Sequence, residues 1–355
     1  EYDVTSLLAV DEQRAFVYYQ AAAESPLQRE LYRVHMEKGL PEKLSSQPGY
    51  NSASFAEQGK FYVNHWSDDN TPQVITLHDG NGKQLRTLEE NQTLRGQVAS
   101  AGFPAKEYIT VPAADGLTSL NGWLLKPRDF NPGRKYPVVL VQYSGPNSQQ
   151  VLDRYGRDWY YALLQEGIVV ACVDGRGTGA RGAEFRHCTY RQLGIIESDD
   201  QIAAARYLAS LPYIDEKAIG IWGWSYGGYN VLMSMSRGNG IFSAGVAIAP
   251  VTDWRFYDTI YTERFMRTPQ QNASGYTSGS ALALADQLQG NLLLIHGTAD
   301  DNVHVQNTIE YSRALIEANK HFDLFFFPDK DHFIRGGNAR KYLYEKVIDY
   351  FKRNL

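Results

Sequence analysis

The stretch Ile219-Gly220-Ile221-Trp222-Gly223-Trp224-Ser225-Tyr226-Gly227-Gly228 decides the fold of this chain. An apolar strand pattern leads into Gly-x-Ser-x-Gly, and a helical pattern continues from there to Met235. Glycines on both sides of Ser225 let the strand and the helix approach closely, so the serine hydroxyl projects from a tight, strained turn. The pentapeptide alone also fits an ordinary Gly-rich turn, but the strand before it and the helix after it favour a nucleophilic serine.

From about residue 105 to the end, apolar strands alternate with helical patterns. The expected strands are apolar runs bounded by Gly, Pro or Asp, at residues 137–143, 167–173, 218–222, 244–248, 291–296 and 323–327. Ser198 and Gln201 predict a capping box at the start of one helix. Leu343, Val347 and Phe351 recur at helical spacing in the last one. This alternation indicates a mostly parallel sheet covered on both faces, with its chemistry at the carboxyl ends of the strands.

A serine nucleophile needs a base and an orienting acid, which follow it in the order Asp, His in the α/β-hydrolase fold. Asp300 comes just after the apolar strand 292–295, with Asp301 as its rival. His332 lies between the last strand and the last helix, and only this histidine fits both order and location. His296, at a strand end, is expected to make a structural hydrogen bond. The sequence thus predicts a serine hydrolase with Ser225, Asp300 and His332 as its triad.

The segment Asp174-Gly175-Arg176-Gly177-Thr178-Gly179-Ala180 follows a strand and matches the dinucleotide fingerprint G-x-G-x-x-A. A bound pyrophosphate would require a helix to begin at once. Arg181-Gly182-Ala183 is a poor helix opening and is expected to continue the loop. No nucleotide site is therefore expected.

The first 104 residues have a different rhythm, with short alternating strands that repeat after about 45 residues. The expected strands are 15–19, 31–35 and 40–44, then 61–65, 74–78 and 83–88. Several strands in each unit of that length are typical of β-propeller blades. Two blades cannot close a propeller, which needs at least about four. The preferred interpretation is a partial β-propeller (its last blades) over residues 1–104, with earlier blades outside this chain, before an α/β-hydrolase domain over 105–355. A small β-sandwich is the alternative.

Composition narrows the function classes. The 355 residues are 43% hydrophobic and 21% charged, as in soluble globular proteins. A net charge of −5 gives no electrostatic reason to expect nucleic acid or an anionic membrane. The longest apolar runs are strand-length and too short to span a bilayer. Cys172 and Cys188 show neither a disulfide framework nor metal-ligand spacing, so free thiols are expected.

Four stretches resemble the prolyl oligopeptidase family, in particular its dipeptidyl peptidase IV branch. They run from Ile221 to Tyr229, 173–177, 257–264 and 296–304. The Trp before the nucleophile and the run Tyr-Asp-x-x-Tyr-x-Glu-Arg distinguish this branch from general esterases. The resemblance extends through residues 105–355, and the two blade-like repeats match the propeller that precedes the hydrolase domain.

The resemblance implies roles for further residues. Tyr143 matches the tyrosine whose hydroxyl completes an oxyanion hole with the backbone N–H of Tyr226. The small apolar pocket for proline is matched by Val251, Trp254, Tyr257, Tyr261 and Val303. Tyr257 also matches a residue near the substrate amine, and Asn302 one that hydrogen-bonds a substrate carbonyl. Periodicity alone would make the stretch 254–261 an amphipathic core helix, and Tyr143 a rim aromatic.

The resemblance also implies an activity: a serine exopeptidase that releases dipeptides from peptides with Pro or Ala in the second position, without metal or cofactor, as a homodimer. An exported location is preferred over the cytoplasm. The paired glutamates that hold the substrate amine in this branch have no matching context in this chain. Neither does the C-terminal disulfide of animal relatives, which favours a bacterial relative. The rivals are a tripeptidyl or acylaminoacyl peptidase and a catalytically silent interaction subunit. The silent subunit would be expected to lose a triad member.

Overall fold

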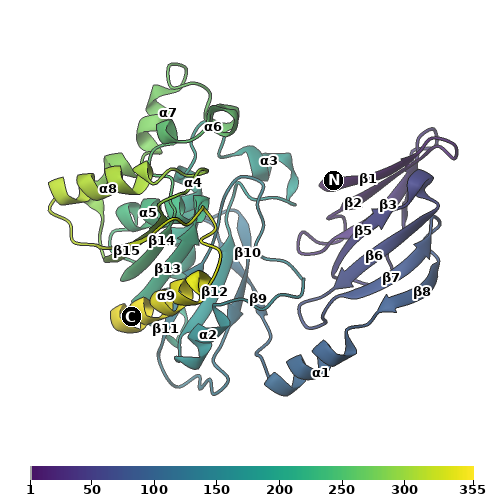
Figure 1. Ribbon diagram of the computed structural model, residues 1–355, viewed down its shortest axis with the longest axis horizontal. Coiled ribbons are helices and arrows are strands. Elements are labelled where there is room, and N and C mark those ends of the chain that lie inside the picture. The colour runs from purple at the N-terminus through teal and green to yellow at the C-terminus, as the bar shows by residue number, and fades with distance from the viewer. Residues whose placement is uncertain (1) are drawn as a thin grey trace. The chain divides into compact units, whose positions relative to one another are not determined.

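The structure is a computed structural model that describes residues 2–355, and it divides the chain into two compact units. The first unit takes the chain up to Lys106, together with Val151–Asp158 and Gly179–Glu184. The second comprises Glu107–Gln150, Trp159–Thr178 and Phe185–Leu355. Figure 1 shows the strands and helices of both.

The first unit contains two four-stranded antiparallel sheets, which confirms the blade-like repeats. One sheet is formed by β1 (Val4–Asp11), β2 (Phe16–Ala21), β3 (Glu30–His35) and β4 (Pro41–Lys43). The other is formed by β5 (Tyr50–Phe55), β6 (Phe61–Ser67), β7 (Val74–Asp79) and β8 (Gln84–Glu89), after which the helix α1 (Gln92–Ala101) follows. Tyr18, Leu31 and Tyr62 are buried in a shared core. The first strand of each sheet was not predicted.

Hydrogen bonds connect the two later segments of the first unit, Val151–Asp158 and Gly179–Glu184, to its earlier residues. The Asp153 carboxylate accepts from the Asp69 amide at 3.0 Å and from Gln28 Nε2 at 3.1 Å. The Gly182 amide donates to Asp3 Oδ2 at 3.0 Å. Residues far along the chain therefore complete this unit.

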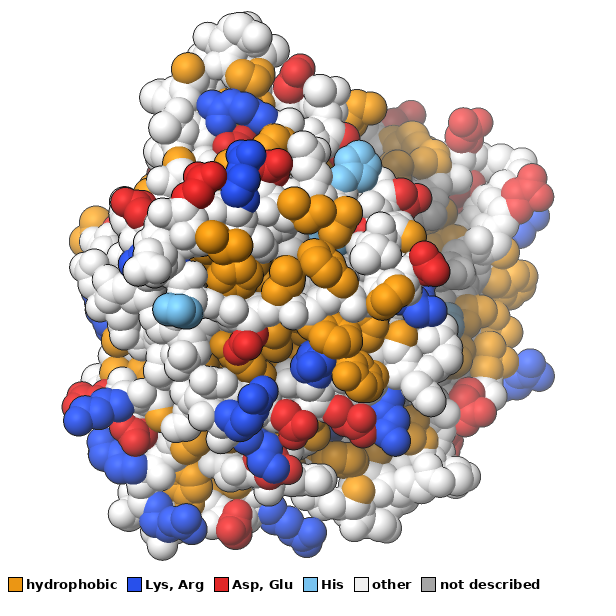
Figure 2. Space-filling view, turned by 60° about the vertical axis from the view of Figure 1, so that its left-hand side comes forward, with side chains coloured by type: hydrophobic (Ala, Val, Ile, Leu, Met, Phe, Trp, Pro, Cys, Tyr) orange, Lys and Arg blue, Asp and Glu red, His pale blue; other side chains and the backbone are white. Residues whose placement is uncertain are grey.

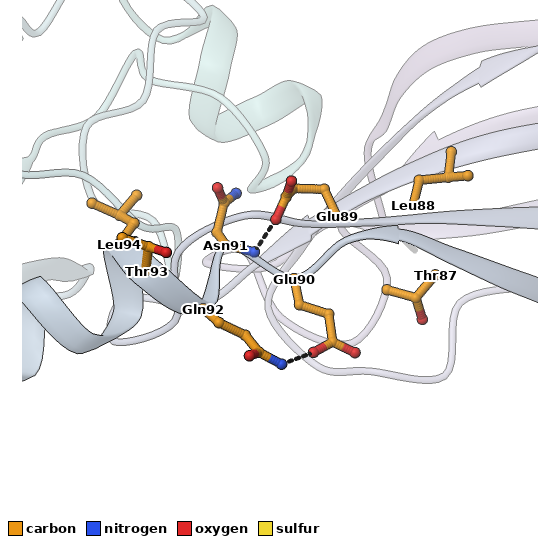
Figure 3. A pocket seen from close by; sticks show the side chains of 8 residues that line it. All are labelled: Thr87, Leu88, Glu89, Glu90, Asn91, Gln92, Thr93 and Leu94. Carbon is orange, nitrogen blue, oxygen red and sulfur yellow. Dashed lines mark hydrogen bonds between the residues drawn. The ribbon is translucent and has the colours of Figure 1, made fainter.

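A hollow at the end of β8 is lined by Thr87–Leu94, as Figure 3 shows. Glu89 accepts from the Asn91 amide and Glu90 from the Gln92 side chain, both at 2.6 Å. One continuous piece of chain makes this polar hollow, and no predicted site residue lies in it.

The second unit is built on an eight-stranded sheet in the order β16-β15-β14-β13-β11-β12-β10-β9. Its strands are β9 (Glu107–Pro112), β10 (Ser119–Leu125), β11 (Tyr136–Val141), β12 (Val169–Asp174), β13 (Ile214–Trp224), β14 (Ala244–Ile248), β15 (Asn291–Gly297) and β16 (Asp323–Phe327). β10 is antiparallel to both neighbours, and all other pairs are parallel. The mostly parallel sheet and its six predicted strands are confirmed, and β9 and β10 extend one edge.

Helices cover both faces of this sheet. The helices after β11 are α2 (Tyr161–Gln165), α4 (Ile195–Ser210), α5 (Tyr226–Arg237), α6 (Thr259–Met266), α7 (Ala273–Ser278), α8 (Gln306–Glu317) and α9 (Ala339–Asn354), and α3 (Gly182–His187) has its first three residues in the first unit. Gly220 faces Phe351 of α9, whereas Gly245, paired with Ile221, faces Met235 of α5. Because successive strand residues point to opposite faces, α5 and α9 lie on opposite sides of the sheet. None of the helices in residues 2–355 is long and apolar enough to cross a bilayer.

The apolar face of the last helix is confirmed, because its Leu343, Val347 and Phe351 are fully buried. The predicted capping box at Ser198 is wrong. Helix α4 already begins at Ile195, and Glu197 accepts a hydrogen bond from the Gly194 amide at 2.9 Å. Gly194 adopts φ 83°, a left-handed conformation that glycine reaches without strain, so the helix starts one turn earlier than the Ser–Gln pattern suggested.

The loop expected at residues 181–183 is present only at Arg181 and is wrong for the other two residues, since α3 begins at Gly182. A backbone amide of the preceding loop is already hydrogen-bonded within the protein: the Arg176 amide donates to Asp200 Oδ2 at 2.8 Å. The Asp200 carboxylate thus accepts the hydrogen bond that this amide would otherwise donate to a phosphate.

Candidate active site

Ser225 stands at a sharp turn between β13 and α5. Its backbone has φ 60° and ψ −118°, and its amide donates to the Ile248 carbonyl at 2.8 Å. A Cβ on Gly223 would collide with the backbone of Gly227, which explains the glycines on both sides. A positive φ at a non-glycine residue costs of order 1–3 kcal/mol, and such strain is typical of a nucleophile held at a turn.

The Asp300 carboxylate is held by several donors at the carboxyl end of β15. Its Oδ2 accepts from His332 Nδ1 at 2.7 Å, and its Oδ1 accepts from the amides of Asn302 and Val303 at 3.0 and 2.9 Å. Burial pulls the pKa of Asp300 upward, but hydrogen bonds from His296 and His332 outweigh it and hold the pKa below its ordinary value. The carboxylate therefore stays ionised beside His332. Its rival Asp301 is exposed.

His332 is buried in the loop after β16 and is tied to the residue before the nucleophile. Trp224 Nε1 donates to the His332 carbonyl oxygen at 3.0 Å. The Arg340 guanidinium lies over the Trp224 ring, 4.7 Å from its centroid. One indole thus joins the loop of His332 to the turn that carries Ser225.

Tyr143 follows β11, and its phenol is close enough to the Ser225 side chain to interact with it. Burial raises the pKa of Tyr143, and the interaction with Ser225 offsets only part of that rise. The phenol is therefore a protonated donor at neutral pH. The start of α5 lies against the end of β11, since a Cβ on Gly227 would be 3.2 Å from Tyr143 Cα. The rings of Tyr143 and Tyr226 lie 6.0 Å apart, centroid to centroid.

Three of the remaining predicted residues pack ring against ring and form an aromatic wall, which consists of Trp254, Tyr257 and Tyr261. Trp254 is 1% exposed and stacks on Tyr261, with ring centroids 5.9 Å apart. Tyr257 lies edge-on to Tyr261 at 5.4 Å, and its hydroxyl donates to Asn302 Oδ1 at 2.8 Å. Val251 and Val303 are buried.

This wall is not the continuous helix that periodicity alone predicted. A short 3-10 turn spans Trp254–Phe256, and α6 begins only at Thr259. Asp258 caps α6 by accepting from the Tyr261 amide at 2.8 Å. The break places the Trp254 and Tyr257 rings 6.1 Å apart at 80°.

Sequence reasoning missed one residue of this region. Glu197 on α4 is fully buried, and its Oε1 accepts from the Tyr226 hydroxyl at 2.7 Å. Burial raises the pKa of Glu197 to about 8. The one local signal was Gly194 three residues earlier, because a glutamate at the third helical position can reach back to the cap.

Comparisons with known proteins match both units. The sequence model of the Prolyl oligopeptidase family matches residues 155–355, and that of the Dipeptidyl peptidase IV (DPP IV) N-terminal region matches residues 1–73. The "Probable dipeptidyl-aminopeptidase B" of Emericella nidulans is 40% identical over 351 residues, which is 96% of this chain and 38% of that protein. The protein of the same name from Aspergillus oryzae is 39% identical over 355 residues, 96% of this chain and 39% of its own.

The crystal structure of Porphyromonas gingivalis dipeptidyl peptidase 4 is 54% identical with a TM-score of 0.97, and the match covers 100% of this chain and 50% of that one. The chain thus spans about two fifths of the curated relatives it matches, and half of this structure. The chain belongs to the prolyl oligopeptidase family, in its dipeptidyl peptidase IV branch.

Proposed function

We propose that this protein is a serine exopeptidase that releases N-terminal dipeptides after proline or alanine in the second position. The observation that carries the proposal is the Asp300–His332 pair, tied through Trp224 to a strained Ser225 that Tyr143 contacts. A nucleophile, a base with its orienting acid, and an oxyanion donor are the groups that acyl transfer requires.

The reaction begins when Ser225 Oγ attacks the substrate carbonyl and His332 Nε2 takes its proton. Asp300 holds the Nδ1 proton of His332, so the other ring nitrogen is free to act as the base. The negative charge on the carbonyl oxygen is received by the Tyr143 hydroxyl and the Tyr226 amide, each contributing about 3 kcal/mol to the transition state. His332 then protonates the leaving amine, and water releases the dipeptide from the acyl-enzyme.

The aromatic wall supports the preference for proline. Trp254 is fixed by stacking against Tyr261, and Val251 and Val303 are buried beside the site. Flat, rigid aromatic side chains suit a pyrrolidine ring, which loses little conformational entropy on binding. The Tyr257–Asn302 hydrogen bond points to these two side chains as polar contacts for the substrate backbone.

The test is mass spectrometry of the products from a peptide with proline in the second position. The full-length protein is compared with its Ser225→Ala variant. Release of the N-terminal dipeptide by the wild type alone is expected. Serine-dependent release of a tripeptide or an internal fragment would keep the triad and overturn the dipeptidyl assignment in favour of the tripeptidyl or acylaminoacyl alternative.

The non-enzymatic alternative is a silent interaction subunit. A fluorophosphonate probe that reacts with activated serines distinguishes the two. We expect labelling at Ser225, and its complete absence in the folded full-length protein would support the silent subunit.

We further propose the domain division 1–104 and 105–355, with the two four-stranded sheets acting together with further propeller blades. Two blades are fewer than the four or so that a closed ring needs. Limited proteolysis followed by mass mapping tests the boundary, with first cleavage expected near residues 102–106.

A homodimer is also proposed. Figure 2 shows hydrophobic side chains gathered on one face of the molecule. Ile309 and Ile316 on α8 are 51% and 69% exposed, and Tyr342 on α9 is 49% exposed. Sedimentation of the wild type should give twice the monomer mass, and Ile316→Glu should lower it because a buried unpaired charge is costly.

A further inference from the structure

Behind Asp300 lies a second histidine, His296, at the end of β15. Its side chain is fully buried. Nε2 is 2.8 Å from the Val303 carbonyl oxygen and 3.2 Å from Asp300 Oδ2, and Nδ1 is 2.8 Å from Thr308 Oγ1. Both ring nitrogens therefore have fixed partners.

These partners determine where the His296 proton lies. A backbone carbonyl can only accept, so Nε2 must carry the hydrogen. That hydrogen is directed at the Val303 carbonyl oxygen, and Nε2 also lies 3.2 Å from Asp300 Oδ2. The Thr308 hydroxyl, buried on α8, is the hydrogen-bond partner of Nδ1.

His296 and His332 both contact the same carboxylate oxygen, Oδ2 of Asp300. Oδ2 of Asp300 receives His332 Nδ1 at 2.7 Å and His296 Nε2 at 3.2 Å, while Oδ1 receives two backbone amides. The carboxylate thus has donors on both oxygens and cannot rotate without breaking them. Among the described residues, the titratable side chains that lower the pKa of this carboxylate are His296 and His332. The charge of the carboxylate in turn raises the pKa of the Tyr257 phenol.

We propose that His296 is a positioning residue that fixes the orientation and charge density of Asp300 and thereby sets the pH at which His332 becomes an active base. The inference rests on the proposed catalytic roles of Ser225, Asp300 and His332. Each donor to a carboxylate withdraws electron density from it and weakens its hold on a neighbouring proton. Without the His296 hydrogen, Asp300 would bind the His332 proton more strongly, and the neutral base would form only at higher pH.

Two substitutions separate this role from simple packing. His296→Gln places an amide N–H near the position of Nε2 and retains a donor to Asp300. His296→Asn is one methylene shorter, so it can still reach Thr308 but not Asp300. His304→Asn is the matched control, because His304 lies on the same segment and is exposed.

The measurement is the rate at which a fluorophosphonate labels Ser225 in the full-length protein, as a function of pH. For His296→Asn, we expect the acid limb of this profile to move upward by about one pH unit, with labelling below that limb reduced roughly tenfold, the order expected for one hydrogen bond to a charged group. His296→Gln should restore most of the wild-type profile, and His304→Asn should not change it.

Thr308→Val provides a second arm. It removes the bond to Nδ1 and leaves the contacts of Nε2, so it should lower the melting temperature and leave the acid limb in place. An equal shift in Thr308→Val and His296→Asn would indicate general loosening and overturn the proposal, as would a wild-type profile in a folded His296→Asn protein. A wild type that is not labelled at all would instead overturn the proposed function.

Discussion

The Tyr226 phenol donates a 2.7 Å hydrogen bond to the carboxyl group of Glu197, and both side chains are buried in the second unit. The Tyr226 amide follows the proposed nucleophile directly, and its ring lies 5.4 Å from that of Trp254. Glu197 on α4 is therefore linked through one side chain to the start of α5 and to the aromatic wall. This carboxyl group has a consequence for stability, because burial raises its pKa to about 8.

Glu197→Gln should flatten the pH dependence of stability. The folded-state pKa lies above the ordinary value of 4.5, so the folded protein binds the proton more tightly than the unfolded chain. The stabilisation is present below pH 4.5 and is lost as the pH rises to about 8, by at most about 1.4 kcal/mol per pH unit. Urea unfolding between pH 5 and 9 measures the slope. Equal slopes in variant and wild type would contradict the assignment.

Asp300→Asn should lower kcat by about 10⁴-fold with the fold intact, because an amide favours the wrong tautomer of His332. Asp301→Asn is the paired comparison, since Asp301 is exposed and is the rival from the sequence. Steady-state kinetics on a dipeptidyl amide with proline in the second position and a chromogenic leaving amine distinguish them. A large loss with Asp301→Asn and a small one with Asp300→Asn would reverse the assignment.

Tyr143→Phe should reduce kcat by about 10²- to 10³-fold and leave KM nearly unchanged, because the phenol is proposed to stabilise the charge that develops in the transition state. The exposed Tyr342 gives a control of the same chemistry, and Tyr342→Phe should have wild-type kinetics. A rise in KM with unchanged kcat would show that Tyr143 acts in ground-state binding only.

Trp224→Phe should lower kcat roughly tenfold by loosening the loop of His332, since it removes the donor to the His332 carbonyl. Trp222 is two residues earlier, and its indole nitrogen has no hydrogen-bond partner among the described residues. Trp222→Phe should therefore have a much smaller effect on kcat. Similar losses in both variants would argue that aromatic packing, and not the hydrogen bond, holds the loop.

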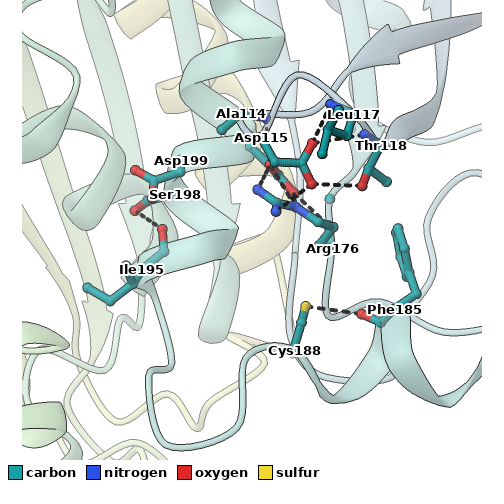
Figure 4. A network of polar contacts seen from close by, with 12 residues as sticks. Ala114, Asp115, Leu117, Thr118, Arg176, Phe185, Cys188, Ile195, Ser198 and Asp199 are labelled. Atoms are coloured by element: carbon teal, nitrogen blue, oxygen red, sulfur yellow. Dashed lines mark hydrogen bonds and ion pairs between the residues drawn. The ribbon is translucent and has the colours of Figure 1, made fainter.

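Asp200→Asn should destabilise the protein by about 3–5 kcal/mol, because it leaves Arg176 without its buried counter-charge. Asp200 is fully buried and accepts from Arg176 Nη2 at 2.7 Å and from its amide at 2.8 Å. Arg176 also reaches the more exposed Asp115 at 2.8 Å, as Figure 4 shows. Asp115→Asn should cost about 1 kcal/mol or less. Urea unfolding compares the two, and equal losses would contradict this ranking.

The parts of the fold that the sequence predicted have strong local signals. The turn at Ser225 requires glycines on both sides. The parallel strands β11 to β15 are largely buried on both faces and therefore read as continuous apolar runs, and the half-exposed edge strand β16 is recognisable by its three phenylalanines. The strand β1 was missed because irregularities in its pairing with β2 break the alternation. The strand β5, Tyr50–Phe55, consists largely of small polar residues and carries no apolar period.

The candidate site was predictable only where a residue follows a recognisable strand. Asp300, His332 and Tyr143 do so. Glu197 lies on a helix where a carboxylate is ordinarily exposed, and only the packing of α4 against α5 buries it. The break before α6 depends on the Asp258 cap, which competes with an unbroken apolar period at residues 254–261.

The chain passes between its two units five times, after Lys106, Gln150, Asp158, Thr178 and Glu184. A gene fragment that begins at Glu107 would consequently encode two stretches whose partners it lacks: Asp153 without the Asp69 amide, and Gly182 without the Asp3 carboxylate. The second unit is thus not a portable module. A chimera of two homologues should therefore fold only if residues 151–158 and 179–184 come from the same parent as the two four-stranded sheets.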